Sequence, residues 1–169
     1  MKKHILRSLL IALPLLFFAA CNQKHPDTDQ LSDSEKLDII NIRLKKTPND
    51  AELLYDRAGI YINQERYNDA LTDLMQATTI APDKTDYQTR LGDTYFRLGD
   101  MEHSYKAFER VAQLDPKNKE AYMKLGEIAF YSKDYDRAME HLSKVTADEP
   151  DNRDALFMKG FIFKETGDT

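Results

Sequence analysis

Few side chains in this sequence are spaced for acid–base, nucleophilic or metal chemistry. The 169-residue chain has four histidines and one cysteine, Cys21. His25 lies in a polar segment, whereas His103 and His141 lie in different helical segments, so no two histidines have the short interval of metal ligands on one helix. The carboxylates alternate with lysine and arginine, which is typical of solvated faces, and no glycine-rich phosphate loop occurs. We therefore expect no catalytic residue, metal or cofactor, and we expect the helical histidines to be solvated.

Cys21 is the position with the most distinctive chemistry. The segment Phe18-Ala19-Ala20-Cys21 resembles a bacterial lipobox, in which two small residues precede a cysteine that is lipidated on sulfur and becomes the new N-terminus. Phe18 departs from the aliphatic residue that the family prefers. The resemblance implies a membrane anchor of several acyl chains such as palmitate, which together hold a protein stably. The following Asn22, instead of the aspartate of inner-membrane retention, favours the outer membrane. The alternative is a buried free cysteine.

The residues before Cys21 have the layout of a secretory signal. Lys2, Lys3 and Arg7 precede an apolar run over residues 9–18. This run is shorter than the roughly 20 apolar residues of a transmembrane helix, and Pro14 interrupts it. We therefore interpret residues 1–20 as a lipoprotein signal peptide and residues 21–31, which lack apolar periodicity, as a flexible tether in the bacterial cell envelope.

The charge of the remaining chain argues against nucleic acid as a partner. Removal of residues 1–20 takes away three of the 24 basic residues and none of the 29 acidic residues, which leaves a net charge of −8. Affinity for phosphate backbones depends on clustered lysine and arginine, and the basic residues here are interspersed with acids. The same balance disfavours an RNA-binding helical repeat. With no cysteine after Cys21, stability must come from packing rather than disulfides.

The elements that carry these residues recur with a period of 34 residues. Prolines and glycines mark the same positions of successive units. The prolines are Pro48, Pro82, Pro116 and Pro150, and the glycines are Gly92, Gly126 and Gly160. Each unit contains two apolar stripes at helical spacing. A capping box formed by Ser32 and Glu35 predicts a further helix over residues 33–46.

This pattern resembles the tetratricopeptide repeat family. The resemblance implies an all-α, superhelical solenoid of antiparallel helix pairs over residues 32–169. The helix at 33–46 is followed by repeats at 51–84, 85–118 and 119–152 and by a partial repeat at 153–169. In each repeat, Gly or Ala in the first helix faces Ala or Ser in the second, so that the two backbones approach closely.

Helix caps follow the repeat, with one departure. Asp50, Asn118 and Asn152 stand where a side chain can accept a hydrogen bond from the next helix. Lys84 occupies the equivalent place and has no acceptor, so we expect Asp83 or Thr85 to substitute. Gln88 replaces a bulky apolar residue of the family, and we expect the neighbouring Tyr87 to fill that space.

In this family the concave surface is lined by the first helix of each pair, so we expect the binding site there. The stripe about 100° from the buried face gives a groove that is aromatic and acidic. Its candidate residues are Tyr55, Ile62, Asn63, Asp93, Phe96, Arg97, Glu127, Phe130, Tyr131, Phe157 and Phe161. Such a groove suits an extended or helical segment with apolar anchors and some Lys or Arg. For Phe96, Phe130 and Phe161, packing against adjacent helices is an equal alternative.

Chaperone-binding members of the family hold a terminal carboxylate with a lysine and an asparagine on the first helix of their first repeat. Tyr55 and Gly59 occupy these positions here, so that clamp is absent. We predict instead a lipid-anchored scaffold or adaptor of the bacterial cell envelope that binds protein segments. The alternative is the docking region of a longer envelope enzyme with its catalytic domain beyond residue 169.

The last segment, 153–169, is apolar on most sides, although a terminal helix normally has a polar outer face. We expect a continuing chain or a partner to cover it, or self-association through it.

Overall fold

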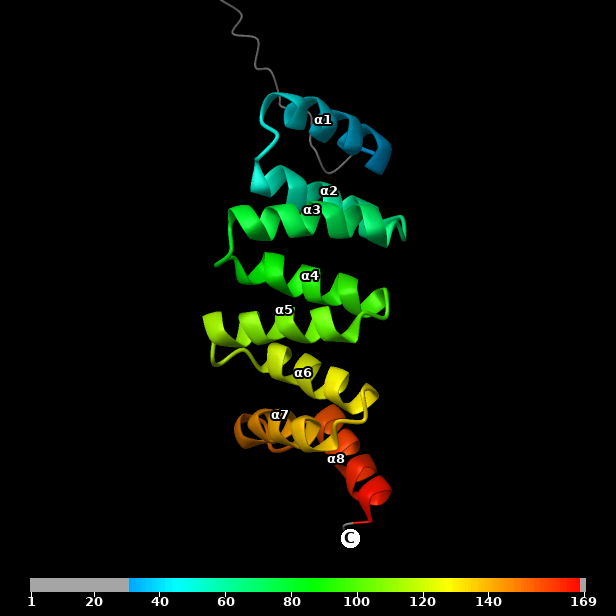
Figure 1. The fold of residues 1–169 in the computed structure, drawn as a ribbon, viewed down its shortest axis with the longest axis vertical. Helices are drawn as coiled ribbons and strands as arrows, with labels where there is room; N and C mark the ends of the chain where they lie inside the picture. The colour runs from blue at the N-terminus through cyan, green and yellow to red at the C-terminus, as the bar shows by residue number, and fades with distance from the viewer. Residues whose placement is uncertain (1–30, 168–169) are drawn as a thin grey trace, which may run out of the picture. The chain divides into compact units, whose positions relative to one another are not determined.

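The computed structural model describes residues 31–167, which form eight α-helices and no strand. The predicted signal peptide and Cys21 lie outside these residues. The helices are α1 (Asp33–Lys46), α2 (Ala51–Asn63), α3 (Tyr67–Ile80), α4 (Thr85–Arg97), α5 (Met101–Leu114), α6 (Lys119–Tyr131), α7 (Tyr135–Asp148) and α8 (Arg153–Thr166) (Figure 1). None of these eight helices has the length and apolar character needed to cross a membrane.

Consecutive helices pair across short turns. The most extensive contacts join α2 to α3, α4 to α5 and α6 to α7, and each pair packs on the next one along the chain. The predicted helix at 33–46 is α1, which lies against α2 (Figure 1). The all-α solenoid of antiparallel helix pairs is therefore confirmed.

Two of the three periodic glycines allow close contact between paired helices. Ser104 Oγ on α5 donates a 2.8 Å hydrogen bond to the carbonyl oxygen of Gly92 on α4. A Cβ added to Gly126 would lie 2.8 Å from the side chain of Leu142 on α7. At Gly160 on α8, no atom lies within 4 Å of an added Cβ. A Cβ added to Gly92 would lie 2.7 Å from the side chain of Phe108, so the glycine is required sterically on α4 and α6 but not on α8.

The predicted caps are present except at α4. Asp50, Asn118 and Asn152 each accept a hydrogen bond from the amide three residues later, and Ser32 and Glu35 form the capping box. The prediction that Asp83 or Thr85 caps α4 is wrong. Lys84 is the N-cap residue, and no side chain caps the helix. The Asp83 carboxylate instead accepts a 2.6 Å hydrogen bond from Arg110 on α5, which draws it away from the amides of α4.

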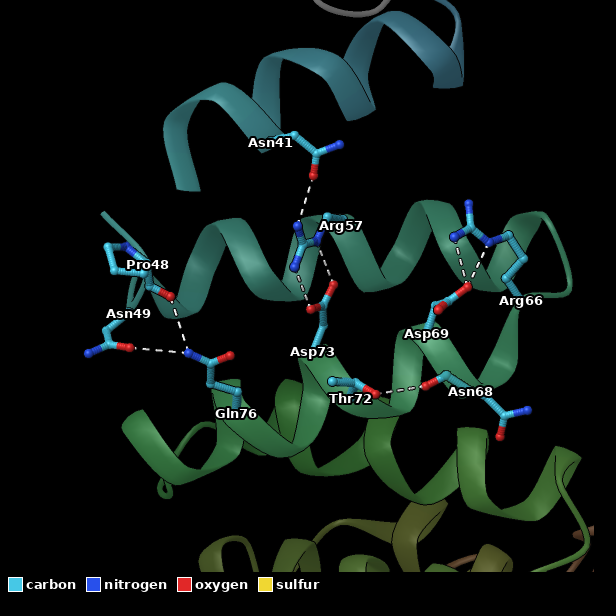
Figure 2. A network of polar contacts seen from close by, with 10 residues as sticks. All are labelled: Asn41, Pro48, Asn49, Arg57, Arg66, Asn68, Asp69, Thr72, Asp73 and Gln76. Atoms are coloured by element: carbon cyan, nitrogen blue, oxygen red, sulfur yellow. Dashed lines mark hydrogen bonds and ion pairs between the residues drawn. The ribbon is translucent and has the colours of Figure 1, made fainter. Parts of the chain in front are cut away.

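A buried ion pair joins the first three helices. Arg57 on α2 donates hydrogen bonds of 2.8 and 2.7 Å to the carboxylate of Asp73 on α3 and one of 2.8 Å to Asn41 on α1 (Figure 2). The side chain of Asp73 is only 5% exposed. The expectation that the carboxylates lie on solvated faces is therefore wrong for Asp73.

His141 is also buried, contrary to the expectation for the helical histidines, whereas His103 is exposed. The hydroxyl of Tyr105 on α5 lies 2.6 Å from His141 Nε2 on α7. Within residues 31–167, Nδ1 of His141 is buried without a hydrogen-bond partner. Burial lowers the pKa of His141. The negative charge of Glu140 raises this pKa in part, and the positive charges of Lys144 and Arg137 lower it further.

We expect His141 to make the protein less stable in mild acid. Because its folded-state pKa lies below the ordinary value of about 6.5, the unfolded chain binds a proton first, and stability falls as pH drops below that value. The loss from one histidine is at most about 1.4 kcal/mol per pH unit. Urea unfolding at pH 7.5 and 5.5 measures it. His141→Gln should reduce the pH dependence, and equal pH dependence in this variant and the unchanged protein would contradict the assignment.

Candidate functional site

The predicted groove residues lie on the first helices of the pairs, α2, α4, α6 and α8. They divide by exposure into two groups. Asn63, Arg97, Tyr131, Phe157 and Phe161 are exposed, and Tyr55, Ile62, Asp93, Phe96, Glu127 and Phe130 are half-buried. The half-buried side chains are held by packing, and the exposed ones are available for contact.

Four aromatic rings from α4, α6 and α8 form a continuous row in which each ring lies near the next. Phe96 lies 6.1 Å from Tyr131, Tyr131 lies 5.7 Å from Phe130, and Phe130 lies 5.3 Å from Phe161, all between ring centroids. We call these four residues the aromatic ladder. Phe96 and Phe130 also pack against the core, whereas Tyr131 is 58% and Phe161 39% exposed. Phe96 and Phe130, which we call the inner rings, therefore pack against adjacent helices, as the alternative expected. Tyr131 and Phe161, the outer rings, are exposed to solvent.

Lys124 on α6 reduces the acidity expected beside the ladder. Its Nζ lies 3.6 Å from an Asp93 carboxylate oxygen and 3.5 Å from a Glu127 carboxylate oxygen. The same ammonium lies 5.6 Å from the centroid of the Phe96 ring. Two of the predicted acidic residues are thus already ion-paired within the chain.

Arg90 on α4 is a second cation that was missing from the predicted groove. Its guanidinium lies 3.7 Å from the centroid of the Tyr55 ring and donates a 3.1 Å hydrogen bond to the Tyr55 carbonyl oxygen. A Cβ added to Gly59 would lie 2.9 Å from Arg90 Nη1. Arg90 therefore covers Tyr55 and Gly59, the two positions where the chaperone-binding clamp was expected to be absent.

Tyr55 is fixed from its other side by Tyr87. The two rings stack with centroids 4.5 Å apart, and Tyr87 is 8% exposed. Tyr87 is buried, as the equivalent residues Leu53 and Ala121 are, and its filling of the space beside Gln88 stays a prediction. Burial raises the pKa of Tyr55 and of Tyr87, so both phenols stay neutral near pH 7.

The sequence contained a signal for the two cations. Arg90 and Lys124 are 34 residues apart and occupy the same position of consecutive units. Each lies over an aromatic ring of the neighbouring first helix, Tyr55 or Phe96, at a distance typical of cation–π contacts.

A cavity of about 290 Å³ lies where α2, α4 and α6 meet. Arg90 and Tyr55 line it together with three carboxylates, Asp86, Asp93 and Glu120. Among the described residues, Asp86 and Glu120 form no ion pair, so they can receive a lysine or arginine of a partner.

Comparison with known proteins gives a consistent family. Two models described as tetratricopeptide repeat match residues 51–84 and 95–159, together more than half of the chain. Heat shock protein STI1 of Saccharomyces cerevisiae is 31% identical over 81 residues, which are 47% of this chain and only 13% of the yeast protein.

Solved structures share the fold at low sequence identity. MamA aligns with a TM-score of 0.75 and 22% identity over 80% of this chain and 74% of its own. YrrB, described as a TPR protein with an unusual peptide-binding site, aligns with a TM-score of 0.74 and 19% identity over 80% of this chain and 70% of its own. The first TPR of Spaghetti (RPAP3), solved with the HSP90 peptide SRMEEVD, aligns with a TM-score of 0.64 and 20% identity over 69% of this chain and 93% of its own.

Proposed function

The chain belongs to the tetratricopeptide repeat family, and from this premise we propose that it is a non-catalytic scaffold that binds segments of other proteins along α2, α4, α6 and α8. The aromatic ladder is the observation that carries the proposal. Its inner rings are fixed by the core, so its exposed rings offer contact area at low entropic cost. Two structural neighbours are described as peptide-binding or peptide-bound.

The partner segment that fits combines apolar anchors with at least one basic residue. The ladder provides an apolar surface over α4, α6 and α8. Asp86 and Glu120 border the cavity between α2, α4 and α6, where they attract lysine or arginine. Lys124 already pairs with Asp93 and Glu127 beside the ladder, whereas Asp86 and Glu120 at the cavity form no ion pair among the described residues, so the basic residue belongs near this cavity.

We further propose that the scaffold acts at the bacterial cell envelope, lipid-anchored through Cys21 and directed to the outer membrane. The support comes from the signal-like residues 1–20 and the lipobox-like residues 18–21. Cys21→Ser should then release the protein from the membrane fraction, and its full retention there would contradict the anchor.

The groove is tested by replacing its exposed rings. Tyr131→Ala with Phe161→Ala should reduce recovery of cross-linked partners from native membranes by about thirtyfold or more, because two truncations that each cost more than about 1 kcal/mol together exceed about 2 kcal/mol. Quantitative mass spectrometry of the captured proteins measures the loss.

Met75→Ala with Ile80→Ala is the matched control, since both side chains are exposed, at 50% and 42%, and lie on α3, outside the predicted groove. This control should capture partners as the unchanged protein does. Equal capture by the ladder variant and the control would show that partners bind elsewhere.

A further inference from the structure

A pocket lies outside the groove, where the third repeat lacks a tyrosine that the first two repeats carry. Tyr61 and Tyr95 occupy the same position of the first two units, and Ala129 follows 34 residues after Tyr95. In the second unit, Tyr95 packs against a core cluster with members on α3 and α5, and its ring stacks on His103 with centroids 5.1 Å apart. The tyrosine thus fills the space between successive second helices.

In the third unit this space is a cavity of about 530 Å³ between α5, α6 and α7. Its apolar surface comes from Met101, Tyr105, Ile128 and Ala129. Ser132, which also lines it, stands where the second unit has Leu98. The loss of a phenol ring and of a leucine side chain therefore accounts for the cavity, and none of the predicted groove residues lines it.

The walls of the cavity are suited to a planar aromatic group. Arg137 on α7 stands at the position of His103, the residue that stacks on Tyr95 in the second unit. Its guanidinium lies 5.4 Å from the centroid of the Tyr105 ring, and a 2.6 Å hydrogen bond to Asp134 holds it there. The hydroxyl of Tyr105 is fixed in turn by His141, at 2.6 Å. An entering ring would meet a cation and an aromatic wall, as Tyr95 meets His103.

We propose that this pocket binds an aromatic side chain of a partner polypeptide, in the place that the Tyr95 ring fills in the preceding unit. The volume exceeds that of one ring and falls within the range of about 300–1,000 Å³ that is typical of ligand pockets, which leaves room for flanking backbone. Glu102, Lys106 and Glu109 along the α5 side offer polar partners for that backbone. The site is independent of the groove proposal, because the two share no residue.

The experiment uses p-cresol, which carries the tyrosine ring, and the peptide N-acetyl-Ala-Tyr-Ala-amide as probes of the purified protein. Ligand-observed NMR titration should show saturable binding of both, with the peptide binding more tightly than p-cresol and more tightly than N-acetyl-Ala-Ala-Ala-amide. Ala129→Tyr should weaken both more than tenfold, because the new ring occupies the pocket from within.

Ala147→Tyr is the matched control, because it places the same ring at an exposed position of α7 and should leave binding unchanged. Arg137→Ala provides a second variant at an exposed side chain, so that the fold is not at risk. It should weaken binding about two- to five-fold, the effect of losing a surface cation–π contact.

Unchanged p-cresol binding in Ala129→Tyr, or in Arg137→Ala if the former does not fold, would overturn the site. If the tyrosine and alanine peptides bound with equal affinity, the proposal that the pocket holds an aromatic side chain of a polypeptide would be wrong.

Discussion

Replacement of Arg57 by methionine is expected to destabilise the protein by about 3–5 kcal/mol, the cost of leaving one buried ionised group unpaired. The carboxylate of Asp73 would remain in the interior, where its side chain is 5% exposed. Within the described residues, its only hydrogen-bond donor is Arg57. Urea unfolding followed by circular dichroism measures the loss.

The reciprocal change should cost less. Asp73→Leu leaves a guanidinium that is 22% exposed and still bonded to Asn41, so water and the amide oxygen compensate in part. We expect a loss of about 1–3 kcal/mol, typical of an incompletely satisfied polar group. A larger loss for Asp73→Leu than for Arg57→Met would contradict this ranking.

Arg66→Met serves as the control for both variants. It removes an ion pair with Asp69 whose two side chains are 47% and 52% exposed. Exposed pairs of this kind contribute about 0–1 kcal/mol, and the cation–π contact of Arg66 with the Tyr61 ring adds about 0.5–1 kcal/mol, so the loss should be smaller than that of Arg57→Met.

Gly126 and Gly160 occupy the same position of successive repeats, but replacing each by alanine should change the stability of the protein in opposite directions. Gly126→Ala places a Cβ 2.8 Å from the fully buried side chain of Leu142, and overpacking of this kind costs about 1–3 kcal/mol. Gly160→Ala meets no atom within 4 Å, so it should stabilise α8 by about 1 kcal/mol through helix propensity alone. Thermal and urea unfolding of the two variants should therefore shift in opposite directions.

Leu142→Ala provides the check on the mechanism. If the clash with Leu142 causes the loss, Gly126→Ala should cost less when Leu142 is already alanine, because residues in contact are not additive. Equal costs in both backgrounds, or destabilisation by Gly160→Ala, would refute the steric explanation.

The fold was predictable from the sequence because the repeat places the same residue types at the same positions of every unit. Small residues such as Gly92 and Ser104 fixed which helices pair, and Asn118 and Asn152 fixed where helices begin. The cap of α4 was not predictable in this way, since the carboxylate of Asp83 is bound by Arg110 from a helix further along the chain.

The polar contacts between helices were the part that sequence reasoning missed. Periodicity assigns a side chain to a face of its own helix, but it does not identify the side chain opposite. Asp73 and His141 were expected in solvent for this reason, although in the interior Arg57 pairs with Asp73 and Tyr105 contacts Nε2 of His141. At the candidate site, the sequence placed the groove residues on the first helices, and their binding of a partner stays a prediction.

The packing of each helix mainly on its neighbours has a mechanical consequence. The principal contacts follow chain order, and fewer contacts cross an intervening helix, such as those of Arg90 with Tyr55 and of His141 with Tyr105. A force applied between α1 and α8 is therefore carried through the helix interfaces in series, and the weakest interface yields first. The rings of Phe96, Phe130 and Phe161 belong to three different helices. A segment bound across them would therefore connect α4, α6 and α8 directly and bear part of the load.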